Sequence, residues 1–180
     1  MADLANKAGG KAIVFARPFS KQAAMVGTKV AYQTTYGYKL SRDSKSEDTK
    51  DGKISKGGSL DGTLSMEMLA SNQDLLNDIE DTVVKGNSME FWIVYTDTPG
   101  SSANKYVARY MVADITSHEE TGDSDNSVSL KLEATIKDGY ARRGEVTLSL
   151  DEANSAYKFK DLGNVTNSES SDSASQPTTK

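Results

Sequence analysis

Several segments of this chain alternate apolar and polar residues with a period of two, the pattern of antiparallel strands with one buried face. Residues 127–137 (SVSLKLEATIK) show it most clearly, and residues 60–69 repeat it. Residues 88–96 (SMEFWIVYT) and 105–117 (KYVARYMVADITS) are rich in the aromatic and β-branched residues that strands favour. The links TDTPGSSAN and HEETGDSDN are rich in turn formers. We therefore predict an antiparallel meander in the second half of the chain.

Weaker signals predict further elements around the meander. Short strands are expected at residues 11–15, 30–38, 144–150 and 156–162. Residues 72–85 are expected to form an amphipathic helix, because apolar side chains recur there at helical spacing, namely Leu75, Leu76, Ile79 and Val83. The predicted fold class is β-rich (all-β or α+β): an antiparallel β-sandwich or small β-barrel with one flanking α-helix.

Residues 39–59 (KLSRDSKSEDTKDGKISKGGS) interrupt this pattern with a long polar excursion. Leu40 and Ile54 are its only apolar residues, and it carries six basic and four acidic side chains. Such a segment cannot bury much surface of its own. We predict a long extended loop that is mobile in the free subunit and ordered only against another subunit.

Composition excludes several kinds of chemistry. The 180 residues carry a formal net charge of −5, so no basic patch indicates a nucleic-acid-binding domain. Cysteine is absent and His118 is the single histidine, which excludes disulfides and cysteine nucleophiles and nearly excludes histidine-based zinc sites. No stretch has the length of a signal peptide's apolar core or of a membrane span, so we expect a soluble protein made in the cytoplasm.

The chain's motifs predict no catalytic, cofactor or metal site. Residues 52–59 have glycines at Walker spacing, but Gly58 stands where the phosphate-binding lysine must be. His118 falls in a predicted turn without a nucleophile partner. Trp92 lies in the most apolar strand and is interpreted as a sheet or core aromatic.

The order of the segments resembles that of siphophage major tail proteins, the tail-tube subunits of long, non-contractile-tailed phages, particularly those of Gram-positive hosts. The matching pieces are the entry GGKAIVFARPF, the helix DLLNDIEDTVVKG followed at once by MEFWIVYTD, the strands of KYVARYMVADITSHEETGDSDNSVSLKLEATI, and GEVTLS. The resemblance covers roughly residues 10–162 and depends on the order of the pieces.

This resemblance implies a tail-tube β domain at residues 11–162, after a flexible N-terminal arm (1–10) and before a disordered polar C-terminal tail (163–180). It implies hexameric rings stacked into a tube, the conduit for DNA ejection, with no catalytic residues and no cofactor. The loop at residues 39–59 would reach neighbouring subunits, with the candidate contact residues Arg42, Lys45, Lys50, Lys53 and Lys56.

The implied partners are further copies of the chain, a tape-measure protein and a tail-terminator protein, with no membrane, and the implied location is the virion tail. DNA would pass through the lumen without specific binding. Because a basic wall would trap a duplex, we expect a net acidic or neutral lumen made by one polar strand face, with Glu90 and Glu133 among its candidates.

Two other functions remain open from the sequence. A carbohydrate- or cell-surface-binding β-sandwich would present aromatic side chains on loops, whereas most aromatic residues here fall inside predicted strands. A secretion-system tube protein would share the expected fold.

Overall fold

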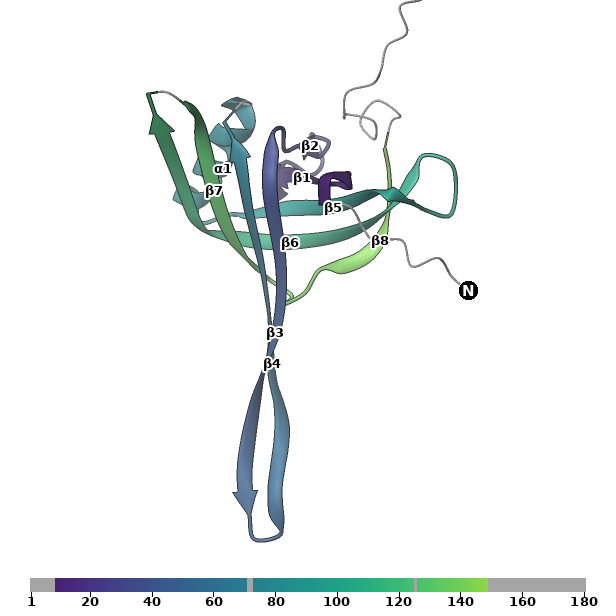
Figure 1. The fold of residues 1–180 in the computed structure, drawn as a ribbon, viewed down its shortest axis with the longest axis vertical. Helices are drawn as coiled ribbons and strands as arrows, with labels where there is room; N and C mark the ends of the chain where they lie inside the picture. Colours follow the sequence, from purple (N-terminus) through teal and green to yellow (C-terminus); the bar gives the residue numbers. More distant parts are fainter. Residues whose placement is uncertain (1–8, 71–72, 125, 149–180) are drawn as a thin grey trace, which may run out of the picture.

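A computed structural model describes residues 9–70, 73–124 and 126–148. Eight strands and one α-helix follow each other along this part of the chain (Figure 1). Their bounds are β1 Ala12–Pro18, β2 Thr28–Lys29, β3 Gln33–Thr49, β4 Gly52–Leu69, α1 Gln73–Lys85, β5 Ser88–Pro99, β6 Lys105–Asp123, β7 Asn126–Ile136 and β8 Arg142–Thr147. Short 3-10 helices at Gly9–Lys11 and Phe19–Lys21 flank β1.

All eight strands belong to one open antiparallel sheet, in which seven follow the order β2-β1-β5-β6-β7-β4-β3 and the eighth, β8, pairs with β6. The 19-residue strand β6 connects its two halves. Near its beginning β6 pairs with β5 on one side and β8 on the other, and from Ala113 onward it pairs with β7. The predicted antiparallel, β-rich fold with a single helix is confirmed, and its strands form a curved sheet rather than a closed barrel (Figure 1).

The main core lies on one face of this sheet, beneath α1. The alternating apolar residues of β4 and β7, such as Leu64, Met66 and Leu132, are buried there as their pattern predicts. Strand β5 adds Phe91, and α1 adds Ile79. A smaller cluster lies on the other face of β1 and β5, with the buried members Phe15, Val94, Ala108 and Leu148.

Helix α1 begins and ends close to the predicted bounds. Its Leu75 and Ile79 are buried against the sheet, while Asp81 and Lys85 form an exposed ion pair one turn apart, with 2.7 Å between their charged groups. This lysine lowers the pKa of Asp81, chiefly through the hydrogen bond. Gly86 ends the helix with a φ of +64°, a conformation that glycine adopts without strain.

Two predicted loops are strands in the structure. Residues 39–59 form the outer part of the β3–β4 hairpin, so the expectation of a loop without partners of its own was wrong. Residues 118–123 continue β6 rather than forming a turn, which places His118 opposite Leu132 in the β6–β7 ladder. In both segments paired strands satisfy the backbone although the side chains are mostly polar.

Some expectations lie outside the described residues. These are the N-terminal arm up to residue 8, the strand at 156–162 and the tail at 163–180.

Candidate assembly surfaces

The outer part of the β3–β4 hairpin, residues 39–59, projects from the body as a two-stranded arm (Figure 1). From Leu40 to Thr49 the arm is about 30 Å long, at a strand rise of about 3.3 Å per residue. Every residue from 39 to 54 is exposed, so packing against the body does not hold the arm in place. The arm therefore offers most of its surface to a partner.

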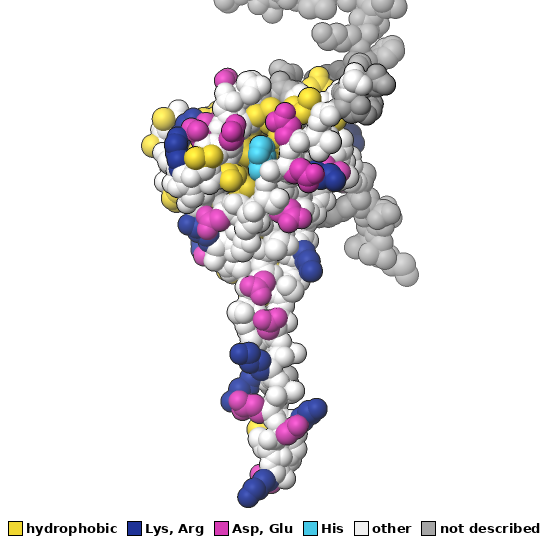
Figure 2. Space-filling model, turned by 90° about the vertical axis from the view of Figure 1, so that its left-hand side faces the viewer, with side chains coloured by type: hydrophobic (Ala, Val, Ile, Leu, Met, Phe, Trp, Pro, Cys, Tyr) yellow, Lys and Arg dark blue, Asp and Glu magenta, His cyan; other side chains and the backbone are white. Residues whose placement is uncertain are grey.

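The five predicted contact residues all lie on this arm, and the structure spreads them along it. Charged side chains of both signs occur along its length (Figure 2). Lys56 pairs with Glu47 at 3.1 Å and Lys53 with Asp48 at 3.9 Å, and all four side chains are more than half exposed. Arg42 lies at a bulge in the hairpin, and Lys45 faces Lys56 across the ladder. The arm is a solvated surface of mixed charge, not a concentrated cationic site.

At the root of the arm, close backbone contacts and one tyrosine fix its direction. A Cβ atom on Gly62 would lie 2.5 Å from the Gly139 carbonyl oxygen, and one on Gly139 would lie 2.3 Å from the Leu60 carbonyl oxygen. Gly139 also has a φ of +71°. The Tyr38 hydroxyl accepts a hydrogen bond from the Ala141 amide at 3.0 Å, and the Arg109 guanidinium lies over its ring at 4.8 Å.

Two strands of the β3-β4-β7-β6 half of the sheet have a side without a partner among the described residues. Along its whole length β3 pairs only with β4. From Ile115 onward β6 pairs only with β7, because its pairing with β5 ends at Asp114. Unpaired strand edges are templates for another strand.

One face of this half-sheet buries the core, and the opposite face is polar. By the ladder register, the polar face carries five carboxylates and three lysines: Asp61, Glu67, Asp114, Glu119 and Glu133 against Lys39, Lys131 and Lys137. Two of the lysines are paired, Lys131 with Glu67 at 3.6 Å and Lys137 with Asp114 at 3.5 Å. The described part of this face is therefore net acidic.

Glu90 does not belong to that face. It lies on the opposite half of the sheet with 3% of its surface exposed, and one of its carboxylate oxygens is 2.6 Å from Arg17. Its other oxygen accepts a hydrogen bond from the Tyr110 hydroxyl at 2.7 Å. Burial, followed by this hydrogen bond, raises the pKa of Tyr110 to about 12. Arg17 also lies over the Trp92 ring at 5.1 Å, so Trp92 is a sheet-face aromatic as expected.

The part of the chain that the structure describes contains no group of three or more potential metal ligands. Within the same residues, no helix has the length and apolar character needed to cross a membrane.

The sequence model of one protein family matches residues 8–138, and that family is described as phage tail tube protein. The chain belongs to the phage tail tube protein family. The predicted membership is thereby confirmed, and the family is one of structural proteins. The matched residues include the core strands, α1 and the arm.

A putative tail protein of Staphylococcus phage phiMR25 is 34% identical over 113 residues, which cover 61% of this tail tube protein and 56% of that relative. The match thus spans little more than half the relative's length. Among solved structures, the SPP1 tail tube protein has a TM-score of 0.69 at 20% identity, covering 91% of this chain and 96% of that one. A chain from the virion of a native gene transfer agent has a TM-score of 0.55 at 11% identity, covering 79% and 100%. At these identities the likeness concerns the fold.

Sequence analysis found the arm and expected one polar strand face, but it did not identify the two unpaired strand edges or the full set of side chains on that face. Residues 60–69 and 127–137 alternate clearly enough to show which side chains share a face. The pairing order of the strands, which brings Glu119 of β6 beside those side chains, requires the structure.

Proposed function

We propose that this tail tube protein polymerises into stacked hexameric rings that form the tail tube, the conduit for DNA ejection. The observation that carries the proposal is the pair of free strand edges, β3 and the distal part of β6, on opposite sides of one four-stranded half-sheet. All three ladders between them are antiparallel, so β3 and β6 run in opposite directions. The β3 of a second copy can therefore pair beside β6 and continue the antiparallel pattern.

This pairing is heterologous, because two different edges of the same chain meet. Repeating a heterologous contact forms a closed ring when the rotation between neighbouring subunits adds up to a full turn. In such a ring every exposed edge of the half-sheet is paired with a neighbour. The comparison proteins support this assembly by analogy: one solved relative is the tail of an empty gene transfer agent particle with C6 symmetry. We therefore propose six subunits in each ring.

In such a ring the polar face of the half-sheet would line the lumen. Its five carboxylates and three lysines give it a net acidic character. A DNA duplex carries one negative charge per about 1.7 Å, and salt screens its repulsion beyond about 10 Å. The wall would therefore repel the duplex weakly and leave it free to slide. Glu133 would contribute to this wall, and Glu90 would not.

The arm would connect one ring to the next, because it projects beyond the half-sheet and is exposed along its length. Its mixed charges suit exposed contacts that give specificity and register more than affinity. The assembled tube would enclose a tape-measure protein and bind a tail-terminator protein at its end. The protein would be synthesised in the host cytoplasm and reside in the virion tail.

Paired cysteines test the lateral contact, since the chain has no cysteine of its own. Ser41→Cys on β3 is combined in turn with Ser117→Cys and Glu119→Cys on β6, and the assembled protein is oxidised. We expect a non-reducing gel to show a ladder of covalent oligomers that ends at six. Ser41→Cys alone is the control and should give no ladder. Dimers only, from every pair, would contradict the proposed ring.

Replacing residues 42–56 with a short Gly-Ser turn tests the arm. The variant should keep the β-sheet circular dichroism of the body and the melting temperature of the parent, yet form no tubes in negative-stain images. A variant that forms tubes of normal length would show that stacking does not need the arm.

A further inference from the structure

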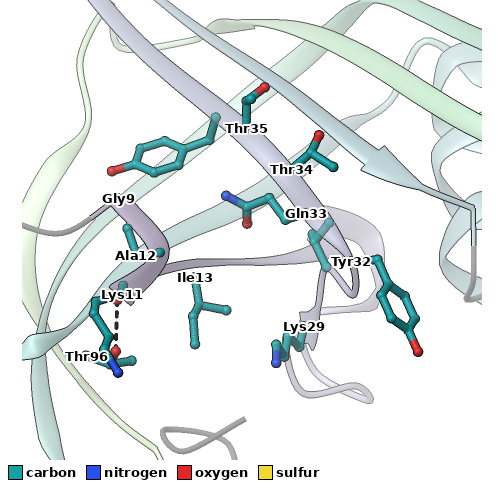
Figure 3. A pocket seen from close by; sticks show the side chains of 13 residues that line it. Gly9, Lys11, Ala12, Ile13, Lys29, Tyr32, Gln33, Thr34, Thr35 and Thr96 are labelled. Atoms are coloured by element: carbon teal, nitrogen blue, oxygen red, sulfur yellow. Dashed lines mark hydrogen bonds between the residues drawn. The ribbon is translucent and has the colours of Figure 1, made fainter. Parts of the chain in front are cut away.

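A slot of about 410 Å³ separates the first half of β1 from the start of β3 (Figure 3). It lies where the two ends of the open sheet, β2 with β1 and β3, approach each other. This slot is distinct from the arm and from the edge of β6. Its lining residues include the threonines Thr34, Thr35 and Thr96 beside the larger side chains of Tyr32 and Tyr36.

Both walls of the slot are strand edges without a partner strand among the described residues. On β1, strand β2 pairs with Phe15 and Ala16 only, and the Val14 carbonyl accepts a hydrogen bond from the Val30 amide. The main-chain groups of Ala12 face the same side as those of Val14 and have no strand beside them, while those of Ile13 face β5. On the other wall, β3 pairs only with β4. Main chain along both walls can thus receive an added strand.

Gln33 gives direct evidence of what the slot accepts. Its side-chain oxygen takes a hydrogen bond from the Val14 amide at 3.0 Å, and its side chain lies between β1 and β3 (Figure 3). An amide side chain here makes the bond that the backbone carbonyl of a neighbouring strand would make. The next position of β1 that faces the slot, Ala12, has no such substitute among the described residues, so an extended peptide would continue the ladder that Gln33 begins.

The charges in the slot define the kind of peptide. Lys11 and Lys29 are among its lining residues, which include no acidic side chain. Neither lysine forms an ion pair with any residue that the structure describes. The complementary occupant is an extended segment that carries carboxylates.

The described chain ends in an apolar cluster that one lining residue of the slot also contacts. Ile13 lines the slot and also packs against the apolar cluster that contains Leu148, the last described residue. The sequence that follows begins SLDEANSAYKFKDL and places Asp151 and Glu152 three and four residues after Leu148. At about 3.3 Å per residue, these carboxylates can reach 10 Å or more from Leu148.

We propose that residues 149–155 of the same chain occupy the slot as an added strand between β1 and β3, with Asp151 and Glu152 beside Lys11 and Lys29. This segment would close the sheet at the start of β3 and leave the rest of the β3 edge open. The inference goes beyond the proposed function and does not depend on it, because it concerns the single subunit.

Disulfide formation within the subunit tests this placement. Thr34→Cys in the slot is combined with Ala153→Cys, and the rate of intramolecular disulfide formation is measured at low protein concentration. The matched control combines Ser102→Cys with Ala153→Cys, because Ser102 lies in the exposed loop whose Asn104 carbonyl binds the Leu148 amide at 3.0 Å. An undocked segment tethered at Leu148 would meet Ser102 at least as often as Thr34.

We expect the slot pair to form its disulfide at least ten times faster than the control pair. Reversing both slot charges, with Lys11→Glu and Lys29→Glu, should remove most of that advantage. Adding Asp151→Lys and Glu152→Lys should restore it. Equal rates for the two pairs, a faster control pair, or disulfides only between chains would overturn the proposal. Charge reversal without effect would overturn the role of the lysines.

Discussion

The body and the arm are made by the same kind of antiparallel pairing but are stabilised differently. In the body, β4 and β7 combine hydrogen-bonded ladders with a buried apolar face. In the arm, the same β4 continues with no buried face. Isolated two-stranded hairpins are marginally stable in water, so the arm depends on the body at its root for its direction. Stability is therefore concentrated in the body, while the arm is free to specialise in contacts.

The largest expected effect comes from removing core volume in the body. Phe91 is fully buried in the main cluster, and Phe91→Ala should lower the free energy of unfolding by about 3–5 kcal/mol. Ile54→Ala, at a half-exposed position on the arm, should change it by less than about 0.5 kcal/mol. Urea denaturation measures both. Similar losses for the two variants would break the comparison between body and arm.

The next largest effect concerns paired charges in the two regions. Glu90→Gln leaves the Arg17 guanidinium without its buried carboxylate partner and should cost about 3 kcal/mol. Glu47→Gln removes the exposed partner of Lys56 on the arm and should leave stability unchanged within error. Thermal melts of the two variants beside the parent make the comparison. A stable Glu90→Gln variant would show that the body tolerates an unpaired Arg17.

A substitution at the root of the arm should have an intermediate effect on the free energy of unfolding. Gly139→Ala places a methyl group 2.3 Å from the Leu60 carbonyl oxygen at a φ of +71°, and we expect a loss of about 2 kcal/mol. Gly144→Ala is the matched control, because a Cβ there meets no atom within 4 Å. If both substitutions are neutral in chemical denaturation, the backbone at the root yields easily and does not fix the direction of the arm.

The smallest expected effect appears only in alkali. Because the pKa of Tyr110 is raised to about 12 in the folded protein, its stabilising contribution is complete below pH 10 and is lost as the pH rises toward 12. Burial also raises the pKa of Tyr36, so ultraviolet absorbance of the phenolates should show more than one tyrosine ionising late, and Glu90→Gln should bring the ionisation of Tyr110 to lower pH. An unchanged titration in Glu90→Gln would remove the Glu90 hydrogen bond as a cause.

Sequence alone predicted the elements whose signal is local. Alternation in residues 60–69 and 127–137 identified the buried faces of β4 and β7, and helical spacing located α1. The arm was found as a polar segment but not as a hairpin, because a strand exposed on both faces has no alternation to detect. The extension of β6 through His118 was missed for the same reason.

Non-local features could not be predicted in this way. Arg17 and Glu90 are 73 residues apart, and only the β1–β5 register brings them together. Glu133 was named as a candidate for the polar face without a means to separate it from Glu90. The β4–β7 and β1–β5 ladders place the two carboxylates in different halves of the sheet.

The continuity of β4 from the arm into the body has a mechanical consequence. A pull on the arm along its length acts parallel to β4, whose inner residues Thr63 to Leu69 are hydrogen-bonded to β7. These bonds lie across the direction of the pull, so they carry the load together in shear instead of opening one after another. The arm therefore resists stretching where β4 enters the body. It bends more easily along the exposed hairpin outside the body.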